Sequence, residues 1–113
     1  MKQVFDVPER GDVVRVSFPS QDGRGRASTR PAVVLSPQAY NARVGSAIVC
    51  PITALVSGYP FEVAVPPDLP VAGVILADQA MSLDWRAHRT ERICSLPSGV
   101  VGEALAKLRA LLG

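Results

Sequence analysis

Arg30 is the residue of this sequence best placed to act on an anion. It stands directly before 31–36, an apolar and β-branched run that is typical of a buried strand. A polar loop, 20–29, precedes it and contains two glycines and two further arginines. Pro31 biases Arg30 toward extended backbone. A guanidinium on a rigid strand beside an adaptable loop suits phosphate capture. The simpler alternative is a solvated residue at a strand start.

Three other polar residues follow apolar runs, namely Thr53, Asp78 and Gln79. An RNA phosphodiester can be cleaved by its own 2′-hydroxyl without a metal, if groups move protons and stabilise a crowded anionic phosphate. Arg30 suits the stabilising role, and hydroxyl or amide groups can donate to phosphate oxygens or base edges. The single histidine, His88, is more simply interpreted as a loop or surface residue. These residue types are candidates for metal-free phosphodiester chemistry, and a solvated position at a strand end is the alternative for each of them.

The charge distribution also favours a nucleic-acid partner. Residues 10–43 hold six arginines against two aspartates, whereas 44–85 hold four acids and no Lys or Arg. Residues 86–92 are basic again, with three arginines against one glutamate. Arginine contacts phosphates through its planar fork and stacks on bases. If the two basic segments converge in the fold, they form one patch for RNA.

Several classes of protein are disfavoured. No apolar run has the length of a membrane span, and the N-terminus lacks the apolar core of a signal peptide, so we expect a cytoplasmic protein. Cys50 and Cys94 are far apart in apolar runs and are expected to be buried free thiols. No P-loop, HExxH or paired metal-ligand spacing is present, which argues against an NTPase or a metalloenzyme. We expect no cofactor and no metal.

The hydropathy pattern predicts a mainly β protein with a C-terminal helix. A length of 113 residues predicts one domain over residues 1–113, with room for a single core. Short strands separated by proline- and glycine-rich turns predict that it folds as a small, partly open barrel. Pro51 indicates a bend or an edge position in the third strand. A connection with one helical turn is expected at 37–45, and a helix with an apolar stripe at 98–112. The expected strands are 13–18, 31–36, 47–53, 61–65, 73–79 running into 81–85, and 91–96.

Five segments together resemble a known family. They are Gly11-Asp12-Val13-Val14, Arg30 to Pro37, Cys50-Pro51-Ile52-Thr53, Gly58-Tyr59-Pro60-Phe61-Glu62-Val63 and Ala77-Asp78-Gln79. In this order and spacing they resemble the MazF/PemK family of toxin endoribonucleases from toxin–antitoxin modules. The likeness runs from about Pro8 to the C-terminal helix.

The resemblance implies an SH3-like barrel that forms a homodimer. It implies sequence-specific, metal-independent cleavage of single-stranded RNA by 2′-hydroxyl attack, which inhibits translation and growth. It implies a cognate antitoxin whose acidic, flexible C-terminal segment occupies the RNA groove. The family's catalytic arginine and threonine fall on Arg30 and Thr53. The residues expected to bind RNA, from this resemblance and from the basic segments, are Phe18, Arg24, Arg26, Asp78, Gln79 and Arg86.

One departure and two alternatives accompany this interpretation. Family members often carry a glutamate in the loop before the arginine, but residues 23–29 contain no carboxylate, so we expect an altered sequence preference. A CcdB-like gyrase poison on the same fold is the runner-up, although this chain ends Leu111-Leu112-Gly113 rather than in the aromatic end of such toxins. The third possibility is an inactive barrel that only holds an antitoxin peptide.

Overall fold

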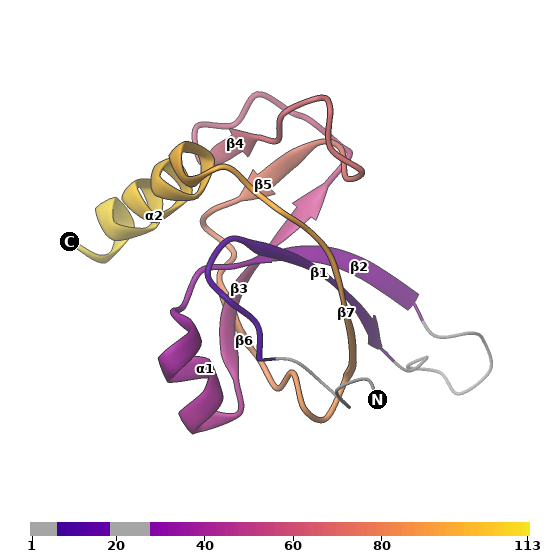
Figure 1. Ribbon diagram of the computed structural model, residues 1–113. Coiled ribbons are helices and arrows are strands. Elements are labelled where there is room, and N and C mark those ends of the chain that lie inside the picture. Colours follow the sequence, from indigo (N-terminus) through magenta and orange to yellow (C-terminus); the bar gives the residue numbers. More distant parts are fainter. Residues whose placement is uncertain (1–6, 19–27) are drawn as a thin grey trace.

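A curved antiparallel sheet and two helices make up the described part of the protein (Figure 1). The computed structural model describes residues 7–18 and 28–113. The helices are α1 (Gln38–Val44) and α2 (Ser98–Leu112). The strands are β1 (Asp12–Phe18), β2 (Ser28–Val34), β3 (Ala47–Thr53), β4 (Glu62–Ala64), β5 (Val74–Leu76), β6 (Met81–Leu83) and β7 (Arg89–Ser95).

The strands form an open sheet rather than a closed cylinder. Their order is β4-β5-β3-β2-β1-β7, with β6 paired to β3 off this path, and every pairing is antiparallel. Among the described residues, β4 and β7 are the two ends of this order. The prediction of a mainly β fold with a C-terminal helix and a partly open barrel is therefore confirmed.

Both faces of the central strands are buried. Along β1 and β2, successive residues alternate between two apolar clusters, so that Val13 and Val33 belong to one cluster and Val14 and Val34 to the other. This explains the unbroken apolar run in β2, because a strand covered on both faces needs no polar alternation. The second cluster includes Trp85, which is 3% exposed. Its indole N–H donates a hydrogen bond to the backbone carbonyl of Asn41 in α1.

Helix α2 covers the first cluster near β4 (Figure 1). Val101 and Ala104 are buried, and Leu105 and Leu108 pack partly against the same cluster. The Lys107 ammonium donates to the carbonyls of Pro60 (2.7 Å) and Glu62 (3.0 Å), which fixes the helix to this edge. The predicted apolar stripe is confirmed in its first part, whereas Leu111 and Leu112 are exposed. None of the helices in the described residues has the length and apolar character that a membrane crossing requires.

Three expectations about the strands and connections need correction. Pro51 does not lie at an edge, because β3 is flanked by β2 on one side and by β6 and β5 on the other. That second side changes partner between Val49 and Ile52, so a proline without an N–H interrupts no bond there. The segment expected as a connection forms the complete helix α1, which ends on Gly45 in the left-handed region (φ 82°).

The expected continuous strand from 73 into 85 is two strands. A turn follows β5, in which the Gln79 N–H donates to the Leu76 carbonyl, and β6 then pairs with a different part of β3. From the Ile52–Ile75 pair to the Val49–Met81 pair, β3 advances by three residues and its partner segment by six, so the turn takes up three residues that a single straight strand could not accommodate.

A buried polar cluster centred on Asn41 joins α1 to the sheet. Its side-chain amide donates to the carbonyls of Pro8 (2.9 Å) and Ser36 (3.1 Å) and accepts from the Ser36 hydroxyl (2.6 Å). The Ser36 hydroxyl oxygen in turn accepts the Ile48 N–H at 2.8 Å. Asn41 is 0% exposed, so these bonds replace water completely.

Asn41→Ala is expected to lower the free energy of unfolding by about 2–3 kcal/mol, because it leaves the buried carbonyls of Pro8 and Ser36 and the Ser36 hydroxyl without their hydrogen-bond partner. Chemical denaturation measures the loss. The control is Gln38→Ala on the same helix, since Gln38 makes an exposed hydrogen bond to the Val7 carbonyl and its loss should stay within about 0.5 kcal/mol. Equal losses in the two variants would contradict the importance of this cluster.

The Glu62 carboxylate holds the loop that follows β3. It accepts hydrogen bonds from the N–H of Ser57 (3.1 Å) and of Gly58 (3.0 Å), and from the Ser57 hydroxyl (2.8 Å). These bonds, the Ser57 N–H foremost, lower the pKa of Glu62 because they favour the charged carboxylate. The loop conformation is therefore coupled to the ionisation of Glu62.

Acid should release this loop. Because the pKa is lowered in the folded state, the stabilisation is fully present above the ordinary glutamate value of 4.5 and is lost as the pH falls through the folded value. Amide hydrogen exchange at Ser57 and Gly58 should rise over that window, after correction for intrinsic rates. In Glu62→Gln the protection should be low and without this pH step, and a step that persists in the variant would refute the coupling.

Candidate active site

The candidate site lies where β2 and β3 separate. The two strands pair only through Ala32–Pro51, Val33–Cys50 and Val34–Val49. Beyond Pro51, β3 pairs with β5 instead, while the first half of β2 remains paired with β1. Continuing the β2–β3 register by two residues would place Arg30 opposite Thr53. The two side chains therefore lie on the same face of the sheet, on opposite sides of the gap between the strands.

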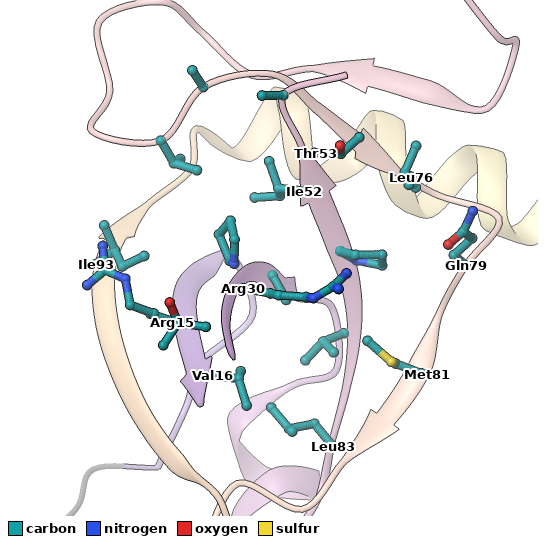
Figure 2. A pocket seen from close by; sticks show the side chains of 18 of the residues that line it. Arg15, Val16, Arg30, Ile52, Thr53, Leu76, Gln79, Met81, Leu83 and Ile93 are labelled. Atoms are coloured by element: carbon teal, nitrogen blue, oxygen red, sulfur yellow. The ribbon is translucent and has the colours of Figure 1, made fainter. Parts of the chain in front are cut away.

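This gap is a cleft of about 800 Å³, which we call the β2–β3 cleft (Figure 2). Its lining comes from both apolar clusters, with Ile52 and Val71 from the first and Val16 and Val49 from the second. Lining from both clusters follows from the separation of the strands, which opens the sheet from one face to the other. A pocket of this size accepts a group as large as a nucleotide.

Arg30 combines a fixed backbone with an exposed side chain. Its backbone pairs with Val16 in the β1–β2 ladder, and its guanidinium extends toward the middle of the cleft (Figure 2). Within the described part of the chain, Arg30 makes no ion pair with a carboxylate. Its five N–H donors are therefore available to an anionic ligand, and a bidentate contact with phosphate suits their geometry.

The Thr53 hydroxyl already accepts one hydrogen bond. Its Oγ1 accepts the Leu55 N–H at 3.1 Å. This bond orients the oxygen and leaves the O–H hydrogen as a donor for a ligand in the cleft. Thr53 ends β3 and pairs with Val74 of β5, so its backbone is fixed by a sheet rather than by a loop.

Gly73 packs directly against the backbone of Thr53. A Cβ at this glycine would lie 2.0 Å from the Thr53 carbonyl oxygen, and its φ of 118° is rarely adopted by other residues. The Gly73 carbonyl also accepts the Val65 N–H at 3.0 Å, which holds the segment in place. The position of Thr53 thus depends on the absence of a side chain at residue 73.

The Asp78–Gln79 pair divides between two environments. Gln79 lines the cleft on the side of Leu76 and Met81 (Figure 2), whereas Asp78 accepts a hydrogen bond from the Tyr59 hydroxyl. That bond raises the pKa of Tyr59 above its ordinary value. The other carboxylate oxygen of Asp78 is buried without a hydrogen-bond partner in the described residues. Asp78 therefore ties the β5–β6 turn to the loop after β3, beside the cleft and not in it.

The other residues expected to bind RNA lie elsewhere or outside the description. Phe18 ends β1 opposite Ser28. Arg24 and Arg26 fall outside the described residues. Arg86 does not line the cleft, because its guanidinium donates to the Ala42 carbonyl (3.0 Å) and lies over the Trp85 ring, 5.0 Å from its centroid. The contribution of these residues to RNA binding remains a prediction.

The two cysteines and the histidine are not part of the cleft lining. Cys50 is fully buried, and this burial, with the Asp78 charge, raises the pKa of its thiol to about 11. Cys94 is half-buried, so the expected burial is confirmed completely for Cys50 and only in part for Cys94. His88 belongs to the turn after β6, where its backbone N–H donates to the Asp84 backbone carbonyl.

Three residues near the site were not identified from the sequence. Arg15 lines the cleft, although its alternation with Val14 and Val16 only indicates an outward-facing strand position. Gly73 precedes a strand, as many turn glycines do, and Tyr59 lies in a loop. Their proximity to Thr53 and Asp78 depends on strand pairing that no local pattern reveals.

The charge of the cleft is positive. Arg15 and Arg30 are the charged side chains among its described lining residues, and no carboxylate is among them. An anionic ligand would therefore meet two guanidinium groups, the side chains of two threonines (Thr29 and Thr53) and the Gln79 amide. This donor-rich composition is suited to phosphate groups along a strand of nucleic acid.

Comparisons with known proteins agree on one family. Residues 9–112 match the family described as PemK-like, MazF-like toxin of type II toxin–antitoxin system. The chain is 38% identical over 107 residues to the endoribonuclease toxin MazF of Escherichia coli K12, covering 95% of this chain and 96% of MazF. It is 36% identical over 110 residues to the endoribonuclease toxin ChpB of the same strain, covering 92% and 93%.

A solved structure extends the agreement to the fold. The MazE–MazF crystal structure (Form-II) from Deinococcus radiodurans superposes with a TM-score of 0.91 at 46% identity, covering 96% of this chain and 98% of that one. The resemblance inferred from the five segments is confirmed. The chain belongs to the family of PemK-like, MazF-like toxins of type II toxin–antitoxin systems.

Proposed function

We propose that this chain is an endoribonuclease toxin that cleaves single-stranded RNA in the β2–β3 cleft and thereby inhibits translation and growth. Residues 1–113 act as one MazF/PemK-like barrel domain. The observation that supports this most directly is the placement of Arg30 and Thr53 on facing strands, with their donors toward one pocket. The relatives named as endoribonucleases agree with this function.

In the proposed reaction, the 2′-hydroxyl gives its proton to water, its oxygen attacks the adjacent phosphorus, and the bond to the 5′ oxygen breaks as that oxygen takes a proton from water. The products are a 2′,3′-cyclic phosphate and a 5′-hydroxyl, and no metal is required. Arg30 stabilises the extra negative charge on the phosphate oxygens, since a guanidinium keeps its proton and is not a base. The Thr53 O–H donates to a phosphate oxygen and holds the phosphate against Arg30.

The partners follow from the same cleft. Single-stranded RNA enters it, and a cognate antitoxin occupies it through an acidic, flexible segment that is attracted by the two arginines. Solved relatives include complexes of MazF with MazE, which supports the antitoxin partner. We also propose a homodimer in the cytoplasm.

The gyrase-poison alternative has less support. The named relatives are endoribonucleases. The single tryptophan, Trp85, is buried in the core and is unavailable to a partner. The cleft with Arg30 and Thr53 favours RNA cleavage.

Incubation of the purified protein with total RNA in a chelator tests the function. The wild type should produce discrete fragments ending in a cyclic phosphate, and Arg30→Ala should cleave about 100-fold or more slowly, since one preorganised donor to the transition state is lost. Thr53→Val keeps the shape without the hydroxyl and should also slow cleavage. Arg109→Ala removes an exposed arginine of α2 and should cleave normally. Intact RNA at high wild-type concentration, or full activity of Arg30→Ala, would refute the proposal.

Gly73→Ala tests the support behind Thr53. The added methyl group collides with the Thr53 backbone, so we expect at least a tenfold lower kcat and a destabilisation of about 1–3 kcal/mol. The matched control is Gly102→Ala in α2, where nothing lies within 4 Å of the new Cβ and helix propensity predicts a gain of roughly 0.5–1 kcal/mol. RNA cleavage assays and thermal unfolding check both variants. Normal kcat in a folded Gly73→Ala protein would show that Thr53 tolerates displacement.

A further inference from the structure

Arg15 enters the β2–β3 cleft from the side away from Arg30. In the β1–β2 ladder Arg15 is opposite Pro31, and Val16 is opposite Arg30. Because adjacent strand residues face opposite ways, the two arginines lie on opposite faces of the sheet. Both nevertheless line the cleft, since the sheet is open there. In Figure 2 the Arg15 side chain extends toward the side of β7, while Arg30 extends into the middle of the cleft.

The resting partner of Arg15 is weakly held. Its Nη1 donates to Glu91 Oε1 at 3.3 Å across the β1–β7 pair. The side chains of Arg15 and Glu91 are 48% and 70% exposed, so water and salt screen this ion pair strongly. One N–H of the guanidinium is used, and its other donors remain available. Arg15 can therefore exchange the carboxylate for a phosphate at little cost.

The chemistry of the cleft indicates which ligand would cause that exchange. A carboxylate-free lining with a guanidinium at each side suits a polyanion that passes from one face of the sheet to the other. Single-stranded RNA carries a phosphate on every nucleotide, so a strand whose scissile phosphate lies at Arg30 presents further phosphates to the cleft.

We propose that Arg15 binds a second phosphate of the RNA strand held at Arg30, and that Glu91 is released from Arg15 when RNA binds. This inference rests on the proposed function. Arg15 contacts a phosphate that does not react, so it contributes equally to the ground state and the transition state. Its role is to hold the strand in the cleft, and it is separable from the role of Arg30.

Salt-dependent binding tests the contact without requiring cleavage. The probe is a fluorescent, mixed-sequence pool of 2′-O-methyl RNA, which lacks the attacking hydroxyl. From about 50 to about 200 mM salt, the slope of log affinity against log salt should become shallower by about 0.7 in Arg15→Ala, with roughly tenfold weaker binding at low salt. Arg109→Ala, which loses an equal charge on α2, should retain the wild-type slope. Identical slopes in the two variants would overturn the proposal.

A double-mutant cycle tests the release of Glu91. Glu91→Gln should bind the same probe about two- to threefold more tightly, because Arg15 no longer leaves a carboxylate. In the Arg15→Ala background this gain should disappear. A gain that persists there would mean that Glu91 acts through general repulsion of RNA and not through Arg15.

Cleavage kinetics separate this inference from the proposed function. Arg15→Ala should raise KM severalfold with a much smaller effect on kcat, whereas Arg30→Ala should mainly lower kcat. If the wild type binds the probe through Arg15 but cuts no RNA, the proposed function fails and the phosphate contact stands. If cleavage requires Arg30 while Arg15→Ala changes neither KM nor the salt slope, the inference alone fails.

Discussion

The end of hydrogen bonding between β2 and β3 is the constraint on which the site depends. Pro31 and Pro51 both lie at this end, and neither has an N–H to donate to a ladder. Beyond these prolines, β2 remains paired with β1, and β3 pairs with β5. Two well-paired strands therefore enclose an opening, which positions Arg30 and Thr53 more precisely than loops would.

Local patterns predicted most of the fold. Alternating or unbroken apolar runs identified β1, β2, β3 and α2, because burial imposes a period on each of them. Of the two alternatives predicted for Pro51, a bend or an edge position, the edge is excluded, since its tolerance comes from a change of partner strand that only the complete sheet reveals. The break between β5 and β6 was missed for the same reason, because it depends on how both strands pair with β3.

Candidate site residues could be predicted from the sequence where the residue type itself suggests the chemistry. Arg30 and Thr53 were identified from their positions at strand ends and from the family resemblance, and both line one cleft. Gly73 and Arg15 were not, because a glycine in a turn and an arginine on a strand are common features with no local mark of function. The roles proposed for them rest on contacts across the sheet: Gly73 packs against Thr53, and Arg15 lines the cleft and pairs with Glu91.

The pairing of the first strand with the last has a consequence for biosynthesis. β1 finds its outer neighbour only in β7, and the apolar cluster containing Val13 is completed by Leu96, Val101 and Ala104. A nascent chain therefore lacks the partners for its core until nearly all of it has left the ribosome. Each copy of this RNA-cutting protein can therefore complete its core only after its own β7 and the first part of α2 have been synthesised.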